Sequence, residues 1–196
     1  MHRSRTGEVS GGAGVSDPLL SDTGKGRLLM NTQDVSPQRM RQIMGSFCSG
    51  VTIVTAGTDT GPAGFTCQSF TSLSLEPPLV TFNPSVTSTS WPKIREAGSF
   101  CVNVLGTEQQ ELSQVFARSG TDKFAGVEHR PSERGHPILD AALAWIECTL
   151  HAEHDGGDHT IVVGEVRAMQ AREDAEPLVF YRGGYARLGT SASLVG

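Results

Sequence analysis

The sequence predicts a mainly β domain, an antiparallel barrel with a few helices at its rim. Many short runs of β-branched and apolar residues alternate with turn residues, and few helical periods separate them. Strands and helices do not alternate regularly, and no strand leads into a G-x-G-x-x-G turn, so a Rossmann dinucleotide site is not expected. The 196-residue chain is 37% hydrophobic, which suffices for one packed domain and some extra length.

The two ends of the chain lack the patterns of folded structure. Residues 1–34 mix Gly, Ser, Thr and charged residues without a sustained hydrophobic period, and they hold no apolar stretch long enough for a signal peptide. We therefore predict a disordered N-terminal tail over residues 1–34, a folded domain over residues 35–190 and a C-terminal tail over residues 191–196. Met30 stands just before the first structured segment, so we expect the natural start to lie close to it.

A helix is predicted at the beginning of the folded domain. Ser36 is a favourable N-cap, Pro37 suits the first helical position and Gly45 suits the exit. Its apolar residues fall at i, i+3, i+4 and i+7 and share one face: Met40, Ile43, Met44 and Phe47.

Most of the remaining chain is predicted to be strand. A long hairpin pairs residues 142–154 with residues 159–170 across the turn Asp155–Asp158, whose two central glycines suit a tight reversal. Shorter β-branched and apolar runs predict strands at residues 51–56, 63–69, 79–82, 100–105 and 178–181.

Two short helices are expected between these strands. The first covers residues 92–97 and is ended by Gly98. For the second, Thr107 with Gln110 forms a capping-box pattern, and the helix runs to about Arg118.

Charge and cysteine content exclude several classes of protein. A formal net charge of −5 makes no electrostatic case for binding nucleic acid or an anionic membrane, and no apolar run approaches the ~20 residues of a membrane helix. The four cysteines form no C-x-x-C pair, which excludes zinc-ribbon and thioredoxin-type sites. We predict buried, reduced thiols in a cytoplasmic protein for all of them: Cys48, Cys67, Cys101 and Cys148.

The first of three polar clusters covers residues 64–72, a strand with mostly small side chains. Gly64 and its small neighbours would let a flat ring approach the backbone, and Thr, Gln and Ser side chains could serve the polar edge of a heterocycle. An edge strand that faces water would have a similar composition, so both interpretations stay open at this point.

The second cluster covers residues 83–92 and is rich in Ser and Thr. Its hydroxyls and backbone N–H groups stand just before a predicted helix, where anions are favoured, and Lys93 and Arg95 add positive charge nearby. The segment is a candidate phosphate site. A solvated loop with a serine helix cap is the alternative.

The third cluster places three histidines and three acids within residues 151–159. His151 and His154 would point to opposite faces of a strand, which argues against a metal site, although the turn could still gather His154, Asp158 and His159. The alternative is a rigid Gly-Gly turn that aims Asp158 and His159 at a ligand. No G-x-S-x-G elbow or oriented Cys/His pair indicates hydrolysis.

Seven short motifs, at Phe47–Val51, Gly64–Phe70, Leu73–Val80, Phe100–Leu105, Asp122–Phe124, Gly157–His159 and Tyr181–Tyr185, carry a family resemblance. In this order they resemble the flavin reductase-like family, the small reductase components of two-component flavin-dependent monooxygenases. The resemblance runs from about Met40 to Leu188. The Cys-Gln-Ser-Phe and His-Asp-Gly-Gly-Asp-His stretches are similar to reductases that serve aromatic or steroid-ring hydroxylases.

The resemblance implies an FMN-binding split β-barrel of Greek-key type with a few peripheral helices, usually a homodimer that binds FMN or FAD near the subunit interface. The strand at 66–69 would lie along the isoalloxazine and ribityl chain, and the loop at 83–90 would hold the phosphate. The residues expected to bind flavin are Thr66, Cys67, Gln68, Ser69, Phe82, Asn83, Pro84, Ser85, Thr87, Ser88, Thr89 and Ser90. Those expected to bind NADH or NADPH are Gly157, Asp158 and His159.

The implied function is an NAD(P)H:flavin oxidoreductase that supplies reduced flavin, by diffusion, to a separate monooxygenase. Hydride transfer belongs to the cofactors, so no acid–base residue is required; His159 is the best catalytic candidate and no metal is expected. Three alternatives remain open: a flavin-retaining oxidase of the pyridoxamine-phosphate-oxidase type, a non-catalytic flavin-binding or sensor module, and a metal-binding protein built on His154 and His159.

Overall fold

The computed structural model describes residues 33–173 and 175–188. The chain divides into two units after Val35, and every helix and strand of the described residues belongs to the second. The tails predicted over residues 1–34 and 191–196 lie almost wholly outside the described residues, so the domain boundaries stay a prediction.

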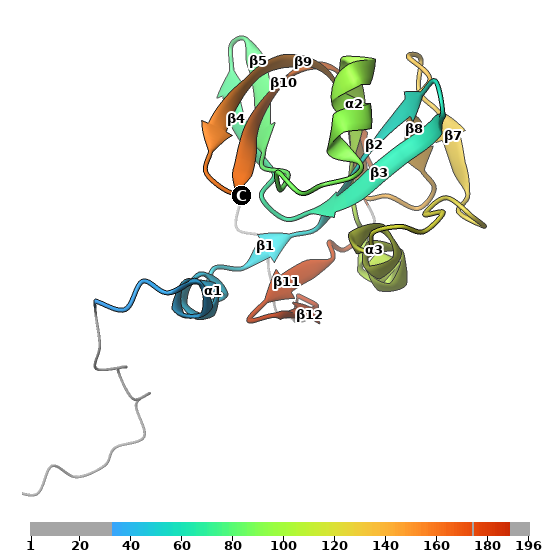
Figure 1. Cartoon of the computed structure of the whole chain (residues 1–196). Helices are drawn as coiled ribbons and strands as arrows, with labels where there is room; N and C mark the ends of the chain where they lie inside the picture. The colour runs from blue at the N-terminus through green and yellow to red at the C-terminus, as the bar shows by residue number, and fades with distance from the viewer. Residues whose placement is uncertain (1–32, 174, 189–196) are drawn as a thin grey trace, which may run out of the picture. The chain divides into compact units, whose positions relative to one another are not determined.

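An antiparallel seven-stranded sheet, in the order β3-β2-β6-β9-β10-β5-β4, is the framework of the second unit. Its strands are β2 Thr52–Thr58, β3 Gly61–Cys67, β4 Thr71–Leu75, β5 Pro78–Phe82, β6 Ser99–Val104, β9 Ala144–Gly156 and β10 His159–Ala171. The sheet curls strongly, and helix α2 (Trp91–Ala97) lies within the curl and packs against β2, β3 and β6 (Figure 1). The mainly β antiparallel fold predicted from the sequence is confirmed.

Smaller elements surround this sheet. Strands β1 (Ser49–Gly50), β11 (Val179–Tyr181) and β12 (Gly184–Ala186) form a three-stranded sheet, and β7 (His129–Pro131) pairs with β8 (Pro137–Leu139). Helix α1 covers Pro37–Met44, and helix α3 covers Gln110–Ala117. Strands β1, β4, β7, β8 and β12 were not predicted, because these short strands lack the continuous apolar and β-branched runs that mark β5 and β11.

The core is divided between the two faces of β2. Val54 and Ala56 point into one apolar cluster, with the aromatic rings of β5, α2 and β6, whereas Val51 and Ile53 point into a second cluster beneath α3 and β11. Successive side chains of a strand alternate between faces, so a strand buried on both faces reads as a continuous apolar run. This explains the unbroken stretch from Val51 to Ala56, in which even the threonines are buried.

The capping box predicted for the third helix is wrong. A short 3₁₀ turn, Thr107–Gln109, precedes α3, and the Gln109 side chain accepts a hydrogen bond from the Gly106 N–H at 3.0 Å. The Thr107 hydroxyl is buried and has no partner among the described residues. The side-chain acceptor at the start of this helix is therefore Gln109, and neither Thr107 nor Gln110 has the predicted role.

Helix α1 has the predicted apolar face, but no part of the described chain covers it. Ser36 accepts the predicted capping bond from the Arg39 N–H, and the helix ends at Gly45. Its four apolar side chains are between 51% and 75% exposed: Met40, Ile43, Met44 and Phe47. Separately, no helix among the described residues is long and apolar enough to cross a membrane.

Three of the four cysteines are buried, as predicted, whereas Cys48 is exposed. Burial, together with the nearby Glu147 carboxylate, raises the pKa of Cys101 and of Cys148 to about 12. Burial also raises the pKa of Cys67. All four thiols are free in the structure.

We predict that iodoacetamide at pH 8 alkylates Cys48 rapidly in the native protein and leaves the other three cysteines unmodified. Alkylation needs an accessible thiolate, and a thiol of pKa 12 is ionised at pH 8 in only about one molecule in ten thousand. Peptide mass mapping after a timed reaction measures the sites. Denatured protein, in which all four should react, is the control, and fast native labelling of Cys101 or Cys148 would contradict the described burial.

Candidate functional site

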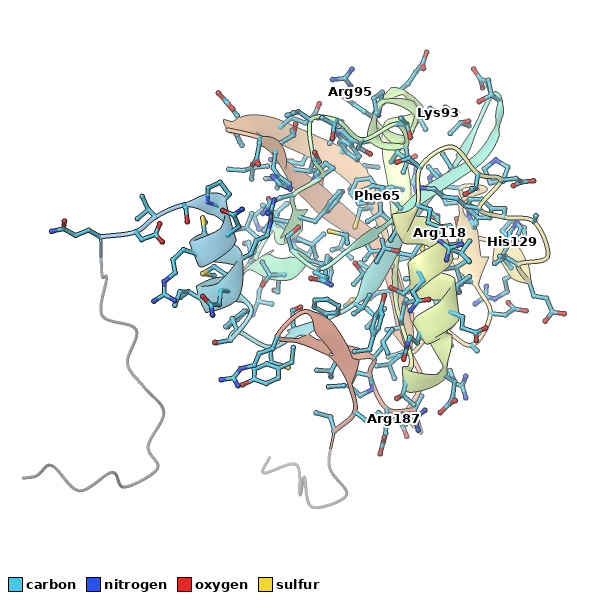
Figure 2. All side chains as sticks on the ribbon, turned by 60° about the horizontal axis from the view of Figure 1, so that its bottom comes forward. Phe65, Lys93, Arg95, Arg118, His129 and Arg187 are labelled. Carbon is cyan, nitrogen blue, oxygen red and sulfur yellow. The ribbon has the colours of Figure 1, made fainter. Side chains whose placement is uncertain are left out.

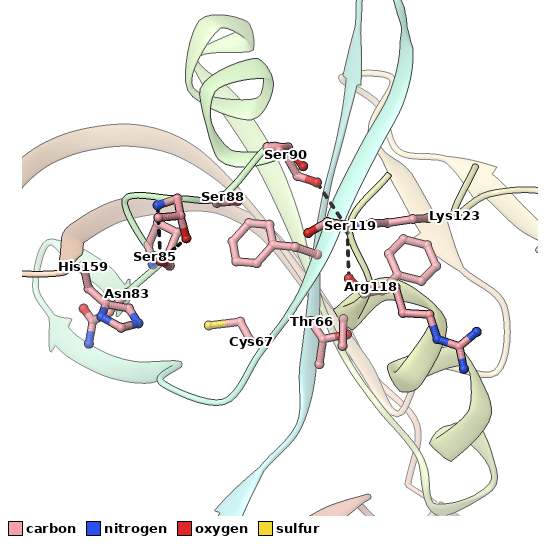
Figure 3. A pocket seen from close by; sticks show the side chains of 16 residues that line it. Thr66, Cys67, Asn83, Ser85, Ser88, Ser90, Arg118, Ser119, Lys123 and His159 are labelled. Atoms are coloured by element: carbon pink, nitrogen blue, oxygen red, sulfur yellow. Dashed lines mark hydrogen bonds between the residues drawn. The ribbon is translucent and has the colours of Figure 1, made fainter. Parts of the chain in front are cut away.

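A cleft of about 280 Å³ lies between β3, the loop after β5, the start of β10 and the end of α3. Figure 3 shows Asn83, Ser85 and His159 at one end of the cleft and Arg118 and Lys123 at the other. Most of the residues predicted from the sequence to bind flavin line this one cleft, together with His159: Thr66, Cys67, Asn83, Pro84, Ser85, Thr87, Ser88, Thr89 and Ser90.

A second hollow of about 480 Å³ adjoins the cleft and shares Asn83 and His159 with it. Gln68 and Ser69, two further predicted residues, line this hollow, as do Gly156 and Ile161. The two hollows therefore meet at Asn83 and His159, so that a ligand in either one would contact this pair.

Three predicted residues lie elsewhere. Phe82 is fully buried, and its ring packs edge-on against Trp91 and Phe100 in the core, so it supports the loop from below and lines neither hollow. Gly157 and Asp158 form the exposed tip of the β9–β10 hairpin and also line neither hollow.

Backbone pairing attaches the hairpin tip to the Ser/Thr-rich loop. The Val86 N–H donates to the Asp158 carbonyl at 3.0 Å, and the Thr160 N–H donates to the Pro84 carbonyl at 2.9 Å. Ser85 and His159 face each other as an antiparallel bridge between these bonds. The second and third polar clusters of the sequence thus form one continuous structure.

Asp158 orients the imidazole of His159. His159 Nδ1 lies 2.7 Å from Asp158 Oδ1, and this hydrogen bond lowers the pKa of the Asp158 carboxyl. A carboxylate accepts, so Nδ1 carries the proton and donates. Nε2 has no hydrogen-bond partner among residues 33–173 and 175–188, which leaves it available to a ligand beside Asn83.

Ser69 links the end of β3 to the loop after β5. Its hydroxyl accepts a hydrogen bond from the Asn83 N–H at 2.8 Å and lies 3.2 Å from Cys67 Sγ. Because burial raises the pKa of Cys67, this residue is a neutral thiol that lines the cleft and is not an activated nucleophile.

The hydroxyls of the Ser/Thr-rich loop are largely engaged within the protein. Ser85 Oγ lies 2.9 Å from Thr87 Oγ1, Ser88 Oγ accepts from the Trp91 N–H, and Ser90 Oγ donates to the Gly64 carbonyl. The backbone N–H groups of Thr89 and Ser90, in contrast, donate to no group in the described part of the chain. Ser88 thus has the cap role that the sequence left open, while the two N–H groups are available to an anion.

The sequence analysis missed the wall of the cleft that the end of α3 and the following loop form. This wall contains Phe65 of β3 and five residues from later in the chain: Phe116, Ala117, Arg118, Ser119 and Lys123. Arg118 is exposed and lies where α3 ends (Figure 2), and its side chain forms no hydrogen bond or ion pair with a described residue. The Asp122-Lys123-Phe124 motif was the one signal in the sequence that pointed to this segment.

Gly64 has a different purpose from the one we predicted. A Cβ atom at this position would lie 2.8 Å from Cε1 and 3.0 Å from Cδ1 of Phe116. The missing side chain therefore lets the Phe116 ring pack against β3, and it does not clear space for a ligand ring.

Chemically, the site offers a partly apolar cleft wall, free N–H groups, one uncommitted guanidinium and an oriented imidazole. No three His, Cys, Asp or Glu side chains of the described residues converge as a metal site would require. Such a cleft suits a planar heterocycle that carries a phosphate, with a second ligand beside the imidazole.

Comparisons with known proteins agree with one another. A family model described as "Flavin reductase like domain" matches residues 44–189. The reductase subunit HsaB of a flavin-dependent monooxygenase from Rhodococcus jostii is 50% identical over 151 residues, which are 77% of this chain and 77% of the relative. Nitrilotriacetate monooxygenase component B from Mycobacterium thermoresistibile matches with a TM-score of 0.78 and 45% identity over 81% of this chain and 90% of that one.

A second solved structure is that of the NADH:FAD oxidoreductase SgcE6 from Streptomyces globisporus, in complex with NAD and FAD fragments. It matches with a TM-score of 0.76 and 35% identity, over 79% of this chain and 94% of that chain.

We predict that Gly64→Ala lowers the free energy of unfolding by about 1–3 kcal/mol, because the added methyl forces the Phe116 ring away from β3. Urea denaturation measures the change. Gly50→Ala is the matched control, since a Cβ atom at Gly50 meets nothing within 4 Å. Equal effects of the two substitutions would show that the close packing of Gly64 and Phe116 does not contribute.

Proposed function

The chain belongs to the flavin reductase-like domain family, and from that premise we propose that it is the reductase component of a two-component monooxygenase. It would oxidise NADH or NADPH, reduce FMN or FAD, and supply the reduced flavin to a separate oxygenase. The observation that carries the proposal is the junction at Asn83 and His159, where the cleft lined by the predicted flavin residues meets a second hollow beside the predicted nicotinamide turn.

The residues of the cleft suit a flavin in the proposed orientation. Thr66 Oγ1 donates to the Ser113 carbonyl at 2.6 Å, so this residue would offer its methyl group and backbone, beside the Cys67 thiol, to the ring and ribityl chain. The free N–H groups of Thr89 and Ser90 would hold the phosphate, together with the Arg118 guanidinium.

The protein's contribution to the reaction is binding and orientation. A bound flavin supplies the chemistry, because it accepts a hydride from the nicotinamide ring. His159, with its tautomer fixed by Asp158, would hydrogen-bond the nicotinamide side through Nε2 and hold the two ligands at reacting distance. Cys67 is a thiol of raised pKa, so we assign it no acid–base role.

The same site is consistent with a reduced flavin that leaves the enzyme. Among the described residues that line the cleft, the cations are Arg118 and Lys123, so a dense arginine clamp around the phosphate is absent from this part of the chain. Weak phosphate binding favours exchange, as diffusion to an oxygenase requires. The alternatives, an oxidase that retains its flavin and a non-catalytic sensor, are not favoured, because the similar proteins are named as flavin reductases or as reductase subunits of monooxygenases.

We also propose a homodimer that forms through the exposed face of α1. Met40, Ile43, Met44 and Phe47 together make an apolar face that no described residue covers, and such faces in water mark contact surfaces. The turn at Asp158 lies close enough to Arg41 of this helix for its charge to help lower the pKa of the Asp158 carboxyl, after the larger effect of His159. A partner on α1 would therefore stand near the nicotinamide turn.

The dependence on intracellular NADH or NADPH, and the free buried cysteines, favour a cytoplasmic location.

We predict that purified protein oxidises NADH or NADPH only when FMN or FAD is added. We also predict that His159→Ala raises the KM for the nicotinamide nucleotide about tenfold, while the KM for flavin changes little. Steady-state absorbance assays with each substrate varied measure both constants. His154→Ala is the matched control, since His154 is exposed on the same hairpin and lines neither hollow. An unchanged nicotinamide KM in His159→Ala would refute the role of this residue, and no flavin-dependent turnover in folded protein would refute the reductase function.

We predict that Ile43→Asp converts a dimer into a monomer, because a carboxylate in an apolar interface is desolvated without a partner. Light scattering after size-exclusion chromatography measures the mass. Met169→Asp, at another exposed apolar side chain of the sheet, should leave the dimer intact. A wild-type monomer, or a dimer that survives Ile43→Asp, would contradict an interface at α1.

A further inference from the structure

The ammonium group of Lys123 lies where three separate segments converge on the cleft. Its Nζ is 3.0 Å from the Gly64 carbonyl of β3, 3.0 Å from the Phe116 carbonyl of α3 and 3.3 Å from Ser90 Oγ. Figure 3 shows Lys123 at the far end of the cleft from His159, on the same side as Arg118. Gly64, Ser90 and Phe116 are all buried.

The two carbonyl acceptors lie where secondary structure leaves carbonyls without a backbone donor, one on an edge strand and one at the end of a helix. Gly64 lies in β3, an edge strand of the seven-stranded sheet, and its carbonyl accepts from Ser90 Oγ as well as from Lys123. Phe116 lies in the last turn of α3, where carbonyls have no intrahelical partner and where positive charge is favoured. Ser90 Oγ gives its own proton to Gly64 and can therefore accept from the ammonium.

The donors of Lys123 are fully used by these contacts. An ammonium has three N–H groups, and three protein acceptors surround it. Burial lowers the pKa of Lys123. Arg118 is the other cation that lines the cleft, and its side chain makes no hydrogen bond or ion pair to a described residue.

We propose that Lys123 is a positioning residue: its ammonium joins β3, Ser90 and the end of α3, and so fixes the walls of the cleft without touching the flavin phosphate. Each of the three acceptors is a neighbour of residues that line the cleft: Phe65 and Thr66 follow Gly64, Thr89 precedes Ser90, and Ala117 follows Phe116. Loss of the ammonium would leave the Phe116 carbonyl unpaired and the Gly64 carbonyl with Ser90 as its remaining donor, and it would let these segments separate. The assignment rests on the proposed function, because it names flavin as the ligand.

Two flavins separate the positioning role from direct phosphate contact. Riboflavin lacks the phosphate of FMN, so a phosphate ligand affects FMN alone, whereas the geometry of the walls affects both. We expect Lys123→Met to weaken the binding of riboflavin and of FMN by the same factor, about tenfold, in fluorescence-quenching titrations. Arg118→Met should weaken the binding of FMN and leave the affinity for riboflavin unchanged. In turnover, Lys123→Met should raise the KM for flavin much more than it lowers kcat at saturating flavin.

A second readout needs no flavin. Cys67 lines the cleft and is buried, so separation of the walls in Lys123→Met should speed its alkylation, while Cys101 and Cys148 in the core stay protected. Arg118→Met should leave Cys67 protected. This readout keeps the two proposals distinct: wild-type protein that binds no flavin would overturn the proposed function, whereas Cys67 would still report on the walls.

Three outcomes would overturn the positioning role of Lys123: a loss of FMN affinity without a loss of riboflavin affinity in Lys123→Met, unchanged affinities for both flavins, or a Cys67 as slow to react as in the wild type. If Lys123→Met fails to fold, Lys123→Gln replaces it. A glutamine amide offers two N–H donors in place of three, so Lys123→Gln should lower the affinity for both flavins by the same intermediate factor. A loss confined to FMN in Lys123→Gln would overturn the role as well.

Discussion

The antiparallel pairing of β10 with β5 is the interaction on which the site depends. Within the sheet it aligns Val162 with Phe82 and Val163 with Thr81. Beyond the end of β5 it continues as the bonds between the 84–86 loop and the 158–160 turn. A loop rich in serine and threonine would otherwise have many conformations, and its ordering would cost entropy at each residue. Because the ladder extends into the loop, the fold orders it before any ligand binds.

The aromatic core beneath the loop stabilises this ladder. Phe82 packs edge-on against both Trp91 and Phe100, and Trp91 donates from Nε1 to the Glu153 carboxylate of β9 at 3.0 Å. Gly164 permits β10 to pass directly over Phe100, since a Cβ atom there would lie 2.6 Å from the ring. The close packing of such rings leaves little freedom for α2, and the loop that enters α2 is held at both of its ends.

The opposite wall of the cleft is held by side-chain contacts and not by further strand pairing, because β3 is an edge strand. Edge strands expose unpaired carbonyls, and here Ser90 and Lys123 satisfy the Gly64 carbonyl while α3 packs on the strand through Phe116. The two walls thus have unlike origins. One is a continuation of sheet hydrogen bonding, and the other is a set of side-chain contacts between segments far apart in the sequence.

The sequence by itself determined the mainly β class, most of the longer strands, the helices with clear caps and the polar clusters that line the cleft. These features have a local cause, since turn residues and periodicity act within a few residues of the chain. It did not reveal that Phe82 faces the core, that Gly64 makes room for Phe116, or that the end of α3 closes the cleft. Those facts follow from strand register and from contacts across some fifty residues, such as Lys123 with Gly64, 59 residues apart. The helix α1 shows the same division: its periodicity predicted an apolar face, but only the tertiary structure shows that the described chain leaves this face exposed.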